Sequence, residues 1–108
     1  MPLYMIQFAY TKEAVANLVK NPEDRTTAVK DMIEKLGGRV LDMYFTFGDY
    51  DGFVIVELPD NVTALAGVAA SRTAGHLAEL RTTVLMTSQD MMQGTQKAGQ
   101  TSLRPPGA

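Results

Sequence analysis

The sequence predicts one α+β domain built on a four-stranded antiparallel sheet with helices on one face. Three observations lead to this prediction. Short segments rich in aromatic and branched residues are interspersed with segments whose apolar residues recur at helical spacing. Two strand-like segments, 39–47 and 52–58, are separated by four residues, which favours an antiparallel hairpin. The length of 108 residues is that of a single domain.

The first elements are a strand over residues 3–10 and a brief helix over 12–20. The helix is expected to stop at Asn21-Pro22, because the residue before proline avoids helical dihedrals. The same pair suits the start of a second helix, with Asn21 as N-cap and Pro22 at the first helical position.

The second helix is predicted to end at Gly37-Gly38, since glycine is the usual residue after a helix C-terminus. One face of this helix is apolar at i, i+3, i+4 and i+7 spacing and should be buried. That face consists of Val29, Met32, Ile33 and Leu36.

The hairpin strands have different patterns. Segment 39–47 alternates, which predicts Leu41, Met43, Phe45 and Phe47 on one face and Val40, Asp42, Tyr44 and Thr46 on the other. Residues 48–51 form the turn, and the following strand is expected to end at Pro59.

The last third of the chain predicts a helix from Asp60 or Asn61 to about Arg72 and a strand over 80–86. Thr87 and Asp90 resemble a capping box that would start a terminal helix reaching about residue 97. We therefore expect one domain over residues 1–93, with 94–108 forming the end of that helix and a flexible tail.

The order β-α-β-β-α-β is the ferredoxin-like arrangement. In such a two-layer fold, the sheet face away from the helices should be polar if it meets water. Here the segment 53–58 is almost wholly apolar, and strand 3–10 carries apolar residues on both sides. The sequence therefore predicts a homodimer whose sheets pack face to face, with polar side chains lining a cavity between them.

Composition excludes several classes of function. Ten basic and 12 acidic residues give a net charge of −2, which argues against a nucleic-acid or anionic-membrane partner. The absence of cysteine excludes disulfides, thiolate nucleophiles and Cys-ligated metals. No targeting signal is recognisable, and no uncharged apolar run approaches the ~20 residues of a membrane helix, so a cytoplasmic location is expected.

Several segments resemble the GYD domain family, whose signature stands here as Gly48, Tyr50 and Asp51 in FTFGDYDG. The opening MPLYMIQFAYT, LVKNPEDRT, the LGG before residue 40 and AGHLAELRTT are also similar to the family's pattern, over about residues 1–90. The resemblance implies a dimeric α+β barrel of the ferredoxin-like class, and it leaves the biochemical function open.

The candidate catalytic residues are His76, Tyr50 and Arg81. In relatives with the dimeric barrel fold, a histidine can hold haem iron or act as a base, and His76 is the single histidine. A histidine hydrogen-bonded to the backbone at a helix end is the alternative. For the GDYD loop, turn chemistry competes with a binding role. Arg25, Arg72 and Arg81 could recognise an anion, but a local ion pair with nearby acidic residues is the expected role of Arg25.

The predicted ligand-binding residues could form a pocket with a few polar anchors, or could simply pack at a dimer interface. They are Gln7, Tyr10, Tyr44, Thr46, Tyr50 and Arg81. We expect no metal and no cofactor, with haem as the exception to test. Three functions stay open at this point: a small-molecule-binding dimer, a cofactor-free or haem-dependent monooxygenase or isomerase, and a structural or partner-binding module.

Overall fold

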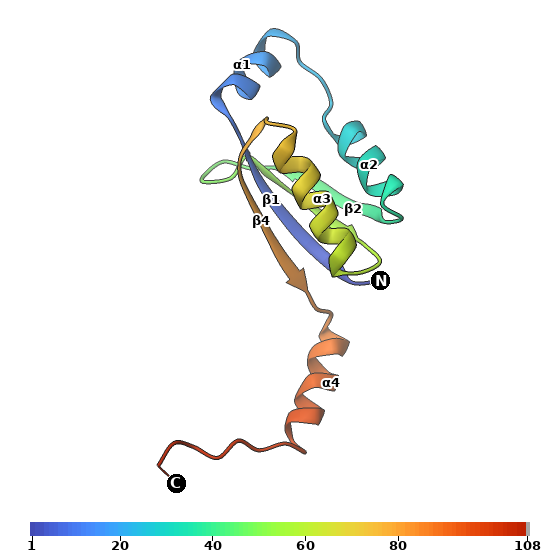
Figure 1. Cartoon of the computed structure of the whole chain (residues 1–108), viewed down its shortest axis with the longest axis vertical. Helices are drawn as coiled ribbons and strands as arrows, with labels where there is room; N and C mark the ends of the chain where they lie inside the picture. The colour runs from blue at the N-terminus through green and yellow to red at the C-terminus, as the bar shows by residue number, and fades with distance from the viewer. Residues whose placement is uncertain (108) are drawn as a thin grey trace.

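The four strands form one antiparallel sheet in the order β2-β3-β1-β4, and helices α2 and α3 cover one of its faces (Figure 1). This is a computed structural model, and it describes residues 1–107. It confirms the predicted ferredoxin-like α+β fold. The elements are β1 (Leu3–Tyr10), α1 (Lys12–Lys20), α2 (Thr26–Lys35), β2 (Arg39–Phe45), β3 (Gly52–Glu57), α3 (Asn61–Thr73), β4 (Leu77–Leu85) and α4 (Ser88–Ala98).

The core lies between the helix-covered sheet face and helices α2 and α3. The Tyr4 phenol is buried in it and donates a 2.7 Å hydrogen bond to Asn61 Oδ1 at the start of α3, so its polar atom is satisfied. The predicted stripe of α2 is confirmed, since Ile33 is buried and its neighbours pack around it. The buried apolar residues are Tyr4, Phe8, Ile33, Val54, Val56, Leu58 and Ala64.

Helix α2 begins four residues later than predicted, at Thr26, so the expected start at Asn21-Pro22 is wrong. Asp24 supplies the reason: its Oδ1 accepts the Thr26 N–H at 2.9 Å, which satisfies a free donor at the helix start. Hydrogen bonds from the backbone and side chain of Thr26 lower the pKa of the exposed Asp24 carboxyl. Residues 21–25 are therefore left as a connecting loop.

The C-terminus of α2 is confirmed at the predicted glycine pair. Gly37 has φ +80°, a conformation that glycine adopts without strain. Its N–H donates to Glu34 O and that of Gly38 donates to Ile33 O, both at 3.0 Å, which is the Schellman pattern. The chain then turns directly into β2.

The strict alternation predicted for residues 39–47 is wrong, because β2 contains a bulge between Val40 and Asp42. Val40 lies opposite Val56, whereas Asp42 lies opposite the next residue, Ile55. The extra residue shifts the pattern by one position, so Val40 and Met43 both pack against the core.

The remaining elements are close to their predicted limits. Helix α3 is capped by Asp60, whose Oδ1 accepts the Thr63 N–H at 2.8 Å, and α4 has the full capping box of Thr87 and Asp90. Strand β4 begins at Leu77, three residues earlier than expected, because its N-terminal end continues the pairing with β1 up to Tyr10.

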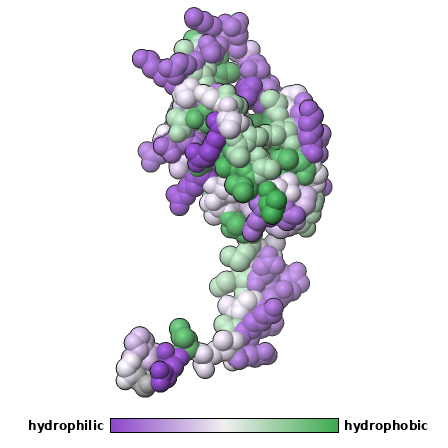
Figure 2. Space-filling view, viewed as in Figure 1, coloured by the Kyte–Doolittle hydropathy of each residue, from purple (hydrophilic) through white to green (hydrophobic). Residues whose placement is uncertain are grey.

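Helix α4 projects from the end of β4 away from the body of the domain (Figure 1). The Cα radius of gyration is 17.8 Å, whereas a compact chain of this length would have about 13 Å. Figure 2 shows hydrophilic residues along one side of α4 and more apolar ones along the other. Within residues 1–107, no helix has both the length and the apolar character needed to cross a membrane. The expected cytoplasmic location, tail flexibility and domain limits stay predictions.

Candidate functional site

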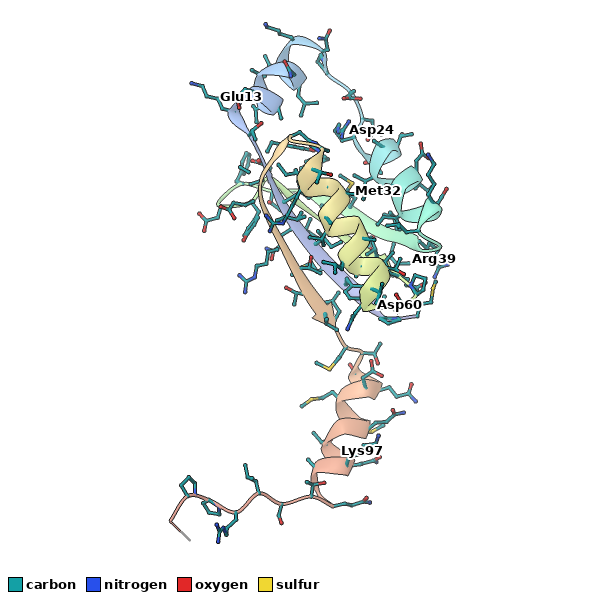
Figure 3. All side chains as sticks on the ribbon, in the orientation of Figure 1. Glu13, Asp24, Met32, Arg39, Asp60 and Lys97 are labelled. Carbon is teal, nitrogen blue, oxygen red and sulfur yellow. The ribbon has the colours of Figure 1, made fainter. Side chains whose placement is uncertain are left out.

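A cavity of about 150 Å³ lies between the helix-covered face of the sheet and helices α2 and α3. Most of its wall is apolar. Met32 reaches it from α2 and lies close to α3 (Figure 3), where the Ser71 hydroxyl approaches its sulfur at 3.8 Å. Other wall residues come from the sheet and from α2 and α3, namely Ile6, Phe8, Val29, Val54, Gly67 and Leu80.

Three polar side chains stand at one end of this cavity: Tyr10, Arg25 and His76. The same three line a second, more open hollow of about 400 Å³, which Asn17, Asn21 and Glu23 also line. The three polar side chains therefore line both the apolar cavity and a wider hollow of mixed polar and apolar lining against α1 and the 21–25 loop.

The pairing of β1 with β4 positions two of these residues. Tyr10 is the last residue of β1 and lies opposite Leu77, which follows His76 in the chain. The Thr11 N–H donates to the His76 carbonyl at 3.0 Å, which continues the ladder by one more bond. As a result the Tyr10 and His76 rings lie 6.3 Å apart between centroids.

Arg25 comes from the N-cap position of α2. Its Nη1 donates to Glu23 Oε1 at 3.3 Å, so the ion pair expected from the sequence is confirmed. The two side chains differ in exposure, at 25% for Arg25 and 57% for Glu23. The guanidinium is thus the more buried partner and belongs to the cavity mouth.

The mouth favours the uncharged forms of its tyrosine and its histidine. Burial raises the pKa of the Tyr10 phenol, an effect that Arg25 partly opposes through its charge and hydrogen bonding. Burial, followed by the charge of Arg25, lowers the pKa of His76. At neutral pH the mouth therefore presents a phenol O–H, a neutral imidazole and a guanidinium.

The GDYD loop has a structural part in this site. Asp51 Oδ2 accepts the Tyr10 N–H at 2.8 Å, and the Asp51 N–H donates to Phe8 O, also at 2.8 Å. Gly48 has φ +107°, a conformation in which a side chain would be strained. A Cβ on Gly52 would lie 2.6 Å from Phe8 Cζ. The loop therefore anchors the end of β1 that carries Tyr10.

The structure distributes the predicted site residues over three places. Tyr10 and His76 line the cavity, and Thr46 and Tyr50 lie in or beside the hairpin loop, joined by a 2.8 Å hydrogen bond from Thr46 Oγ1 to Tyr50 O. The other three share the sheet face away from the helices, where Gln7 is paired with Arg81, and Tyr44 with Phe53. Their roles in binding stay predictions.

Arg25 lines the cavity mouth but was not among the predicted site residues. Its position beside Glu23 indicated an ion pair, and that pair did not reveal that the loop folds over the end of β1. Within the described part of the chain, His, Asp and Glu side chains form no group of three or more that could hold a metal ion.

The model of the GYD domain family matches residues 4–94. The chain belongs to the GYD domain family. Among curated proteins no match was found. In this chain the residues of the GYD signature, Gly48, Tyr50 and Asp51, lie in the loop that holds the Tyr10 backbone at the cavity mouth.

Solved structures show the same fold at low sequence identity. MtbAldR is 18% identical with a TM-score of 0.57, and the match covers 81% of this GYD chain and 53% of that protein, so the chain spans about half its length. Ribosomal protein S6 from Thermotoga maritima is 19% identical with a TM-score of 0.51, covering 91% and 97% of the two chains. An uncharacterised NIPSNAP domain protein from Burkholderia xenovorans is 14% identical with a TM-score of 0.50, covering 82% and 95%.

Proposed function

We propose that this GYD domain protein is a small-molecule-binding homodimer whose ligand enters the cavity between the sheet and helices α2 and α3. The observation that carries the proposal is an apolar cavity with three polar side chains gathered at one end. Ligand sites in proteins have this composition, because apolar walls supply affinity and a few polar groups fix orientation.

The size of the cavity limits the ligand. A dry cavity of about 150 Å³ can accept a molecule as large as benzene, and this cavity has that volume. The apolar part of the ligand is therefore one ring or a short branched chain, and the rest lies in the wider hollow beyond Arg25 and His76.

Ligand entry can be tested with benzene and the full-length chain. We expect saturable changes in the amide NMR spectrum at residues lining the cavity, together with a rise in melting temperature, since ligands that bind only the folded state stabilise it. Val29→Phe should fill the cavity and abolish both effects, whereas Leu65→Phe, at an exposed position on α3, should leave them unchanged. An absence of saturable binding to the wild type would contradict the proposal.

The homodimer is proposed from the other face of the sheet. Met5 lies opposite Ile55 in the β1–β3 pairing, and Gln7 lies opposite Phe53, so their side chains share the face that α2 and α3 leave open. These residues are half-buried in the single chain. A half-buried face that combines apolar side chains with dispersed polar ones is typical of a protein interface.

Helix α4 supports the same proposal. Met91 and Met92 on this helix are 65% and 56% exposed, although methionine is well suited to packing surfaces. The helix leaves the body at the end of β4, an edge strand of the open face (Figure 1). A second copy would cover both the open face and the apolar side of α4.

The dimer can be tested by sedimentation and light scattering on the full-length chain. Ile55→Lys places a charge on the open face and should give a monomer, whereas Val62→Lys, at an exposed position of α3, should not change the mass. A monomeric wild type at high protein concentration would overturn the proposal.

An enzyme of the cofactor-free monooxygenase or isomerase type is the second candidate, because His76 lies at the cavity mouth with a pKa below its ordinary value. A neutral imidazole can accept a proton from a bound substrate. We do not propose haem inside this cavity, because a volume of about 150 Å³ accommodates a single ring and not a macrocycle. A substrate turned over by the wild type and bound without turnover by His76→Gln would support this candidate.

A further inference from the structure

We infer that the ligand of the sheet–helix cavity is a monocarboxylate with an apolar tail no bulkier than one ring, and that Glu23 holds the position of the ligand's carboxylate on Arg25 when the cavity is empty. This inference rests on the proposed ligand-binding function and specifies the chemical class.

The Arg25 guanidinium is the group that would bind the carboxylate of the ligand. Arg25 is about three-quarters buried beside apolar residues of the cavity, including Ala28 and Val29. Its ion-pair partner is one exposed carboxylate at 3.3 Å, contacted through a single nitrogen. A guanidinium carries five N–H donors in a planar fork that matches a carboxylate with two parallel hydrogen bonds. The contact with Glu23 at 3.3 Å and a hydrogen bond to the Tyr10 phenol leave other donors of this fork available to a ligand.

Other hydrogen-bond donors lie around the Arg25 guanidinium. The Tyr10 phenol is protonated at neutral pH and can donate its O–H, and a neutral His76 has one ring N–H. The second acidic side chain nearby, Asp51, is already engaged with the Tyr10 backbone N–H. The mouth therefore offers three kinds of donor, and among the described residues the carboxylate paired with Arg25 is that of Glu23.

Glu23 is easily displaced from Arg25. It is the more exposed partner, and ion pairs at the surface stabilise a protein by about 0–1 kcal/mol. Glu23 lies in the loop between α1 and α2, outside both helices. Its presence shows that the mouth accepts a carboxylate group, and a ligand that also fills the apolar cavity would replace it with the additional gain of burying its tail.

The inner wall of the cavity determines which tail the ligand can have. Behind the three polar residues, the wall consists of aliphatic and aromatic side chains, with the Ser71 hydroxyl already donating to Gly67 O at 2.8 Å. No buried side-chain nitrogen or oxygen within residues 1–107 lacks a hydrogen-bond partner. The inner chamber thus has no unsatisfied group to recognise a second polar substituent, and the tail should be plain hydrocarbon.

The test compares two ligands of the same shape, 3-phenylpropanoate and 3-phenylpropanamide, by calorimetry and amide NMR on the full-length chain. We expect the carboxylate to bind about tenfold tighter or more, since hydrogen bonds to charged groups are stronger than neutral ones. Arg25→Met should remove this preference, and Arg25→Lys should keep part of it. Arg39→Met breaks the ion pair with Glu57 on the open face and should leave the preference intact.

Glu23→Gln tests the displaced carboxylate. This variant should bind 3-phenylpropanoate up to about fivefold tighter and 3-phenylpropanamide unchanged, because only the competing charge is removed. Glu34→Gln, at an exposed position of α2, should change neither affinity.

The outcomes separate the two proposals. Equal binding of the amide and the carboxylate, or a preference that survives Arg25→Met, would overturn the carboxylate assignment and leave the cavity as a ligand site. If both ligands and benzene fail to bind, the proposed function fails as well. Unchanged carboxylate affinity in Glu23→Gln would overturn the part assigned to Glu23.

Discussion

The two faces of the sheet carry similar side chains and are completed in different ways. On one face, Phe8 and Val56 of β1 and β3 are covered by helices of the same chain and are 6% and 0% exposed. On the other, Met5 and Phe53 of the same strands are half-buried, with no helix across them. Both faces carry apolar side chains along β1 and β3, so the hydrophobicity of these two strands alone does not indicate which face holds the core.

The two faces of the sheet differ in where their polar side chains lie. On the helix-covered face, polar side chains gather at one end, around Tyr10 and His76. On the open face they are spread across the strands, where Gln7 lies opposite Arg81. A gathered set favours one small ligand, and a dispersed set suits a broad interface.

The largest expected effect comes from a matched pair of phenylalanine substitutions. Phe8→Ala should lower the free energy of unfolding by about 3–5 kcal/mol, because it removes a buried aromatic ring. Phe53→Ala should cost the single chain about 1 kcal/mol. In a dimer it should cost more, by an amount that depends on protein concentration. Chemical denaturation at several concentrations measures both, and equal, concentration-independent losses would contradict the distinction between the faces.

Gly52→Ala should come next, at about 1–3 kcal/mol, because the added Cβ would lie 2.6 Å from Phe8 Cζ and 2.7 Å from Tyr44 O. The added Cβ should displace Phe8 on the helix-covered face. Because Phe8 lines the cavity, the substitution should also weaken benzene binding. Gly94→Ala on α4 is the control, since a Cβ there meets nothing within 4 Å. An unfolding free energy as high as that of the wild type would show that this close approach is unimportant.

Asp51→Ala should lower the free energy of unfolding by about 1.5–3 kcal/mol, since it removes a charged acceptor from the half-buried Tyr10 N–H. Asp51→Asn keeps an acceptor oxygen and should lose less. Thermal denaturation compares the two. If they are equally destabilised, the hydrogen bond to Tyr10 is not the reason that the loop needs an aspartate.

The smallest effect is the titration of His76. Because its folded-state pKa lies below the ordinary 6.5, the folded chain binds fewer protons than the unfolded chain at mildly acidic pH. The stability associated with His76 should therefore be complete above about pH 6.5 and be lost as the pH falls through the folded-state pKa. NMR titration of the imidazole should give a lowered value that rises in Arg25→Met, and an ordinary value in the wild type would contradict it.

Much of the fold followed from local pattern. The stripe of α2, the glycine pair that ends it and the Thr87–Asp90 capping box are each decided by residues close together in the sequence. The start of α2 was predicted wrongly, because Arg25 is the N-cap residue and the Asp24 carboxylate accepts the Thr26 N–H. The local pattern predicted one start, at Asn21-Pro22, whereas the helix begins at Thr26 after the loop.

The candidate site was predictable only in part. Antiparallel pairing of the first and last strands brings Tyr10 beside His76, and both were candidates. Arg25 reaches the same place through a loop without regular structure, whose course depends on contacts far along the chain. The face assigned to Val40 was also wrong, since a bulge has no clear signal in an alternating segment.

The bulge between Val40 and Asp42 has a consequence for solubility. Strand β2 is an outer strand of the sheet, and its unpaired backbone groups could template the addition of strands from other molecules. A bulge bends such an edge and interrupts its row of donors and acceptors. The same residue that shifts Val40 toward the core therefore protects the domain against open-ended edge-to-edge aggregation.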